Sequence, residues 1–101
     1  MLKHIRITSD GVIVDADRSV HTTRRGEGGP DKVQWQVQGA GNEKYQIRFG
    51  YLSGSPFQAE SPHIIDLPHP PLAVSQDPRR YKYDVLKNGT VTDDPDVIID
   101  S

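Results

Sequence analysis

Three short stretches of the chain alternate apolar and polar residues in strict step. They are residues 33–37 (Val-Gln-Trp-Gln-Val), 45–51 (Tyr-Gln-Ile-Arg-Phe-Gly-Tyr) and 81–85 (Tyr-Lys-Tyr-Asp-Val). A period of two places successive side chains on opposite faces of a strand, so each stretch is predicted to bury one face and expose the other. The third stretch runs into Asn88-Gly89, a dipeptide that favours a tight hairpin turn. These patterns predict an all-β protein.

Turn-forming residues between the apolar runs predict two further hairpins. Ile5–Ile7 and Val12–Val14 flank Thr8–Gly11, and Gly39–Asn42 separates the first two alternating stretches. The inward positions of all these strands define a predicted core. It comprises Ile5, Ile7, Val12, Val14, Val33, Trp35, Val37, Tyr45, Ile47, Phe49, Tyr81, Tyr83, Val85, Val97 and Ile99.

Residues 52–80 break the alternating pattern. Six of the eight prolines fall here, and proline is confined to sheet edges and bulges because it cannot donate to a ladder. We interpret the segment as a half-buried crossover between sheets, anchored by Phe57, Ile64, Leu67, Leu72 and Val74. With short strands over 19–23 and 96–100, the chain is predicted to be a single antiparallel β-sandwich domain of about seven strands, residues 1–101, with immunoglobulin-like or cupredoxin-like topology.

Composition narrows the classes of partner. Twelve basic and 14 acidic residues give a net charge of −2, so no overall field favours nucleic acid. No apolar run approaches the roughly 20 residues of a membrane span. The chain has no cysteine, which excludes disulfides, thiolate catalysis and zinc–sulfur sites. Because small secreted domains often depend on disulfides, and no signal-peptide core follows Met1, we expect a cytoplasmic protein.

His63, Asp66 and His69 form an H-x2-D-x2-H spacing that suggests a metal site. Prolines around them exclude a helix, and residues six apart in a polyproline-like chain lie roughly 18 Å apart. One ion cannot bridge that distance unless the chain turns sharply at Asp66-Leu67-Pro68. We therefore expect a proline-rich loop with solvated histidines, and keep a metal-dependent or hydrolytic protein as the alternative.

A second alternative is a calcium-binding sandwich domain. Asp15 and Asp17 follow one strand, while Asp93, Asp94 and Asp96 lie at the start of another. Calcium takes six to eight oxygen ligands, which carboxylates on adjacent loops can supply. Neither run matches an EF-hand loop, and nothing in the sequence brings the two runs together. We interpret both as solvated turns.

No pattern of nucleophile and base stands out. Ser53 and Ser55 lie in a Gly-Tyr-Leu-Ser-Gly-Ser-Pro segment that is not a G-x-S-x-G elbow, and no strand-to-helix turn is predicted there. The glycine-rich segments at 26–29 and 39–41 lack the strand–helix context of a phosphate loop. We expect a protein that is not an enzyme and that uses no cofactor.

Side-chain amides dominate one predicted face. Gln34, Gln36, Gln38, Gln46 and Arg48 occupy the outward positions of the hairpin expected between the first two alternating stretches. Amides both donate and accept hydrogen bonds, so this face is suited to sugar or protein. We predict a non-enzymatic binding module whose partner is a protein or a second copy of the chain, held through loops or an open sheet edge. Two arginine pairs, at 24–25 and 79–80, are too few for nucleic acid unless they converge.

Two resemblances accompany this prediction. The Tyr81-Lys82-Tyr83 strand, with Trp35 as a buried aromatic partner, resembles the penultimate strand of cupredoxin-like and immunoglobulin-like sandwiches. A blue-copper site is excluded because it needs a cysteine thiolate. Segments 33–35 (Val-Gln-Trp), 55–57 (Ser-Pro-Phe), 81–85 and 94–99 (Asp-Pro-Asp-Val-Ile-Ile) together resemble the DP-EP family of small uncharacterised bacterial proteins. That resemblance covers residues 33–100, implies an all-β sandwich, and transfers no site residues.

Overall fold

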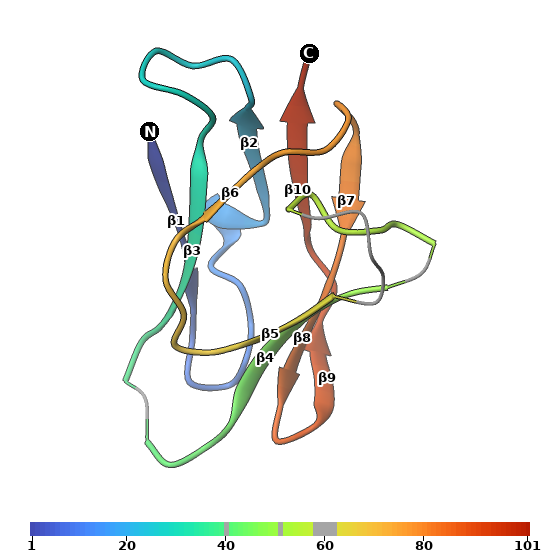
Figure 1. Cartoon of the computed structure of the whole chain (residues 1–101). Helices are drawn as coiled ribbons and strands as arrows, with labels where there is room; N and C mark the ends of the chain where they lie inside the picture. Colours follow the sequence, from blue (N-terminus) through green and yellow to red (C-terminus); the bar gives the residue numbers. More distant parts are fainter. Residues whose placement is uncertain (40, 51, 58–62) are drawn as a thin grey trace.

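The computed structural model describes residues 1–39, 41–50, 52–57 and 63–101 (Figure 1). Within these residues ten strands form three small sheets, which confirms the all-β class. The strands are β1 (Leu2–Ile7), β2 (Ser19–Thr23), β3 (Lys32–Val37), β4 (Tyr45–Phe49), β5 (His63–Asp66), β6 (Leu72–Ala73), β7 (Arg80–Lys82), β8 (Asp84–Lys87), β9 (Thr90–Asp93) and β10 (Asp96–Asp100). One 3-10 turn, η1, covers Asp15–Asp17. None of the helical structure in this part of the chain is long or apolar enough to span a membrane.

The strands pair in a mixed arrangement. Sheet A has the order β1-β3-β6, sheet B β2-β10-β7 and sheet C β5-β4-β8-β9. The pairs β1–β3 and β2–β10 are parallel, so the expectation of a purely antiparallel arrangement is wrong. The chain leaves β1, forms β2 in sheet B, and returns to sheet A as β3 running in the direction of β1. Parallel neighbours need such a crossover connection.

A long bent hairpin joins sheets B and C. Its first arm is β7 followed by β8, interrupted at Tyr83, and its second arm is β9 followed by β10, interrupted at Asp94-Pro95. The Tyr83 amide donates to the Pro95 carbonyl at 3.1 Å, which keeps the arms together through the bend. At the tip, Asn88 and Gly89 have φ of +52° and +82°, the turn that the dipeptide predicts. These interruptions divide each arm into two strands, which raises the strand number above the expected seven.

The hairpin predicted between the first two alternating stretches is absent. β3 lies in sheet A and pairs with β1 and β6, whereas β4 lies in sheet C and pairs with β5 and β8. The connection after β3 therefore links two sheets rather than two neighbouring strands. Alternation reports which residues face inward, but it carries no information on which strand pairs with which.

The turn after β1 is a short antiparallel return with a different register from the one predicted. Ile7 and Ile13 form a bridge, so their side chains share one face; Ile13 is 1 % exposed and Val12 41 % exposed. The prediction that Val12 and Val14 face the core is wrong by one position, because a one-residue shift exchanges the two faces of a strand. Gly11 has φ of +79°, and a Cβ at this position would collide with the Thr92 side chain.

The proline-rich segment does connect two sheets. β5 is an edge strand of sheet C, and β6 pairs with β3 in sheet A. Its inward side chains differ in part from the predicted anchors: Ile65 is buried, and Ile64 is 51 % exposed. Val74 is fully buried, and Phe57, Leu67 and Leu72 pack against the core at its margin as expected.

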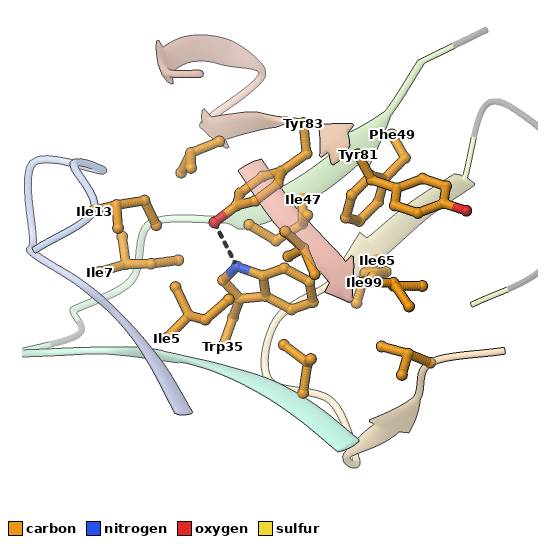
Figure 2. Close-up of a cluster of buried hydrophobic side chains, with 14 residues drawn as sticks. Ile5, Ile7, Ile13, Trp35, Ile47, Phe49, Ile65, Tyr81, Tyr83 and Ile99 are labelled. Carbon is orange, nitrogen blue, oxygen red and sulfur yellow. Dashed lines mark hydrogen bonds between the residues drawn. The ribbon is translucent and has the colours of Figure 1, made fainter. Parts of the chain in front are cut away.

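The core is one cluster to which all three sheets contribute (Figure 2). Trp35 lies within it, 2 % exposed, with its ring centroid 6.1 Å from that of Phe49, 5.9 Å from Phe57 and 5.3 Å from Tyr83. Its indole N–H donates to the Tyr83 hydroxyl at 3.1 Å. Burial raises the pKa of the Tyr83 phenol, so this oxygen stays protonated and accepts the bond while uncharged.

Candidate functional site

A groove of about 600 Å³ opens beside the C-terminal half of β3. One side is β3 itself and the other is the bend after β5, at Leu67–His69. We call it the β3 groove; its walls are formed by Arg6, Gln34, Trp35, Gln36, Val37, Gln38, Gly41, Glu43, Tyr45, Leu67, Pro68 and His69. Ligand sites in proteins are concavities of about 300–1,000 Å³ with a few convergent polar groups, and the β3 groove falls in this range.

The groove follows a strand edge that is only partly paired. β6 pairs with β3 at Lys32 and Val33 and at no later residue of the strand. The Lys32 and Gln38 backbone N–H groups donate to the Met1 and Ile7 carbonyls. The backbone N–H and C=O groups of even-numbered residues in β3 therefore point toward β1. Because the backbone N–H and C=O groups of successive strand residues point to opposite edges, those of Trp35 and Val37 point toward the groove.

His69 occupies part of this edge. Its Nε2 accepts the Trp35 backbone N–H at 3.0 Å, and its backbone carbonyl accepts the Gln34 side-chain amide at 2.9 Å. A ring nitrogen that accepts a backbone N–H carries no proton, so this contact requires neutral His69 with its proton on Nδ1. Burial lowers the pKa of His69, although the Pro70 backbone opposes this, and the neutral form is favoured. His69 therefore occupies one hydrogen-bonding group of this strand edge, although it does not belong to a neighbouring strand.

The two charged residues in the groove walls, Arg6 and Glu43, differ in whether they have an ion-pair partner. The Arg6 side chain donates to the Asp17 carboxylate at 2.8 Å, and this contact lowers the pKa of Asp17. Glu43, by contrast, is exposed and makes no hydrogen bond or ion pair with any residue that the structure describes. The charge of Arg6 is balanced by Asp17, and His69 is uncharged. The Glu43 carboxylate is therefore the charged group of the groove that no described residue pairs with.

The predicted amide-rich face is divided between two sheets. Gln34, Gln36 and Gln38 follow β3 along the groove, as their alternation implies. Gln46 and Arg48 lie on β4 in sheet C, where they bind the Asp66 and Asp84 carboxylates. The prediction of one continuous face is wrong because it depended on the β3–β4 hairpin. Its β3 half remains a feature of the groove.

His63, Asp66 and His69 do not come together. The chain bends at Leu67 and Pro68, as a metal site would require, but each of the three side chains contacts a different partner. His63 contacts Ser55, Asp66 accepts from Gln46, and His69 accepts from Trp35. Within the described ranges no three histidine or acidic side chains are placed to hold a metal ion. The expectation of solvated histidines is also inaccurate, since burial lowers the pKa of both His63 and His69.

Sequence patterns gave no sign of the contact between Ser55 and His63. The Ser55 Oγ lies 2.8 Å from His63 Nδ1 and also accepts the Phe57 backbone N–H at 3.1 Å. The pair has the spacing of a nucleophile and its base, but Ser55 is only 3 % exposed, and in the described part of the chain no carboxylate bonds to His63. The contact holds the start of β5 against the preceding loop.

The two aspartate runs considered for calcium are neighbours in the structure. Arg18, directly after η1, places its guanidinium 2.7 Å from the Asp93 carboxylate, which also accepts the Ile13 amide. Asp17 is held by Arg6, and Asp96 pairs with Arg80 at 3.4 Å. Three of the five aspartates are thus paired with arginine side chains, and the Arg18–Asp93 pair forms a structural junction between the residue after η1 and the bent hairpin.

The two arginine pairs partly converge at sheet B. Arg79 lies over the Tyr81 ring, 4.0 Å from its centroid, and Arg24 is close enough to act on the Tyr81 hydroxyl electrostatically. Asp77 acts on the same hydroxyl with the opposite sign, and Asp96 pairs with Arg80. This end of the sheet carries mixed charge rather than a continuous basic surface.

The requirement for neutral His69 predicts acid sensitivity. A histidine whose pKa is lower when folded than when unfolded binds fewer protons in the folded state, so stability falls as the pH drops through about 6.5, the ordinary histidine value. His63 acts in the same direction. His69→Gln keeps an acceptor for Trp35 but does not titrate, so its urea midpoint, followed by Trp35 fluorescence, is expected to fall less between pH 8 and pH 5. Exposed His4→Gln is the control; an unchanged pH dependence in His69→Gln would contradict the assignment.

Comparison with known proteins adds no relative: no family model, no curated protein and no solved structure matches this chain. The resemblance to the DP-EP family therefore stays a prediction.

Proposed function

We propose that the protein is a non-enzymatic binding module and that the β3 groove is its ligand site. One observation carries this proposal: a concavity of about 600 Å³ lies against a strand edge whose backbone groups at Trp35 and Val37 have no strand partner in the described part of the chain. Unpaired edges are the places where sheet proteins accept another segment, and natural proteins otherwise cover them.

The surrounding residues favour binding over catalysis. Gln34, Gln36 and Gln38 offer uncharged donors and acceptors along the groove, and none of them is a nucleophile or a general base. Ser55 and His63, the pair with a nucleophile–base spacing, are absent from its walls.

We also propose the β-sandwich as the architecture, because side chains of all three sheets share one core. We propose a cytoplasmic location as well; the observation that supports it is the absence of cysteine from the sequence.

The test is a fragment screen read residue by residue. A library of small, soluble organic fragments is titrated against ¹⁵N-labelled protein, and backbone amide shifts are mapped. Binding sites of natural ligands attract fragments because they are concave and partly desolvated. We expect the shifted amides of several unrelated fragments to converge on residues 34–38 and on Leu67 and His69. Hits that scatter over the surface, or converge on another region, would contradict the proposed site.

A further inference from the structure

We propose that the β3 groove binds an extended polypeptide segment that carries a lysine or arginine side chain, and that this segment adds to the free edge of β3 as a further strand. The inference rests on the proposed function and names the class of its ligand. Three features of the groove support it: the direction of the backbone groups, the division of its side chains between two faces, and its charge.

The backbone of β3 offers a peptide the hydrogen bonds of a sheet. Trp35 and Val37 point their N–H and C=O groups away from β1, and the Trp35 N–H is already taken by His69. The Trp35 carbonyl and the Val37 N–H and carbonyl are left, and within the described ranges no strand pairs with them. An extended peptide repeats its own N–H and C=O groups at the same two-residue interval, so it matches this edge in the manner of β-strand addition.

The side chains of the groove differ between its two faces. Gln34 and Gln36 lie on the outer face of β3, where they can bind the polar side chains of a peptide. Toward the interior the groove meets Val37, Tyr45 and Leu67, which are apolar over most of their surface. A strand whose residues alternate between apolar and polar fits such a division, since its successive side chains point to opposite faces.

The groove is poorly suited to a sugar. Aromatic rings bind apolar faces of a ligand only when their own faces are accessible. Trp35 and Tyr45, the aromatic residues of the groove walls, are 2 % and 4 % exposed. The backbone edge of β3 that no described strand pairs with instead favours a polypeptide.

Charge selects the kind of peptide. Arg6 is paired with Asp17, and His69 must be neutral to accept the Trp35 amide. The Glu43 carboxylate is the charge that a ligand would meet without competition from a described residue. Complementary charge favours a lysine or arginine in the peptide, and its main effect is on partner choice and association rate.

A display library of random heptapeptides, selected against the immobilised full chain, provides the probe. We expect selected peptides to alternate β-branched or other apolar residues with polar ones and to contain a lysine or arginine. Glu43→Gln is expected to weaken binding about two- to fivefold, which is the scale of one exposed charge pair. Glu27→Gln, which makes the same charge change on an exposed loop outside the groove, is the control and is expected to leave binding unchanged.

Methylation of the peptide backbone tests the strand-addition geometry. A selected peptide is resynthesised with N-methyl groups on alternate residues, in the two possible registers. Methyl groups on the amides that face β3 remove hydrogen bonds of about 1 kcal/mol each and add a steric clash, so one register is expected to bind at least about tenfold more weakly than the other. Equal affinity of the two registers would overturn the inference, as would failure to select any peptide that shifts the amides of residues 34–38.

The two proposals fail in different ways. Convergence of fragments on the groove, together with loss of every peptide result, would retain the binding site and reject polypeptide as its ligand. Enrichment of fragments bearing several hydroxyl groups, with no peptide selected, would indicate a carbohydrate instead and would equally overturn the inference. Absence of both fragment and peptide binding at the groove rejects the site itself.

Discussion

Replacement of Trp35 by alanine is expected to be strongly destabilising and to move the urea midpoint far below that of the wild type. Trp35 contacts Phe49, Phe57 and Tyr83 through its ring, and its removal would open a cavity where three sheets meet. Truncation of a large buried aromatic residue costs about 3–5 kcal/mol. A domain of this size has a total stability of about 5–15 kcal/mol, so at least about a fifth of it is lost. Because Trp35 is the single tryptophan, the urea transition is followed by circular dichroism.

A milder substitution separates the indole hydrogen bond from the packing. Tyr83→Phe keeps the ring but leaves the buried Trp35 N–H without its acceptor, which is expected to cost about 1–3 kcal/mol. Tyr45→Phe is the matched control, since the Tyr45 hydroxyl donates to the carbonyl of Ser9, an exposed residue that water can satisfy. Equal midpoints for Tyr83→Phe and Tyr45→Phe would show that the buried bond has no special weight.

The second large effect is expected at Asp93. Burial opposes ionisation of its carboxyl, but the Arg18 side chain and the Ile13 amide outweigh that effect, so the pKa of Asp93 is lowered. Asp93→Ala removes the acceptor of both and is expected to cost about 1.5–3 kcal/mol, the range for hydrogen bonds to charged groups. The partial exposure of Arg18 keeps the expectation within that range. Urea unfolding followed by Trp35 fluorescence measures it.

Acid titration provides a second readout of the same junction. A carboxyl whose pKa is lowered by folding stabilises the protein above its ordinary value of 3.8, and this contribution is lost as the pH falls through the folded-state pKa. Asp93→Ala is therefore expected to flatten the acid limb of the stability curve below about pH 4. Asp94→Ala, a change at the adjacent exposed carboxylate, is the control. If both variants matched the wild type, the junction would contribute nothing to stability.

Local patterns in the sequence predict the strands but not their partners. Trp35, Ile47 and Val85 are buried as the alternation requires, and the Asn88-Gly89 turn forms as its chemistry predicts. The turn residues Gly39–Asn42 predict one hairpin for the two glutamine-bearing strands, β3 and β4, although these strands belong to different sheets. Pairing is decided by contacts between residues far apart in the chain, such as the parallel match of β1 with β3, which a local pattern does not encode.

The candidate site shows the same division. Gln34, Gln36 and Gln38 were identified from their outward positions, because the period of a strand is a local property. The role of His69 is not predictable in this way, because it depends on a bend in the proline-rich segment that brings His69 against Trp35 of β3. Nothing in its neighbours in the sequence distinguishes a histidine that accepts a distant backbone amide from a solvated one.

The amide of Val37 gives the most direct measurement of whether β3 accepts a further strand. Hydrogen exchange at this amide is compared in the free protein and in the complex with a selected heptapeptide, with the Gln38 amide, already bonded to Ile7, as the internal reference. We predict that Val37 changes from rapid exchange to marked protection on binding, while Gln38 is protected in both states. Rapid exchange of Val37 in the saturated complex would contradict strand addition at this edge.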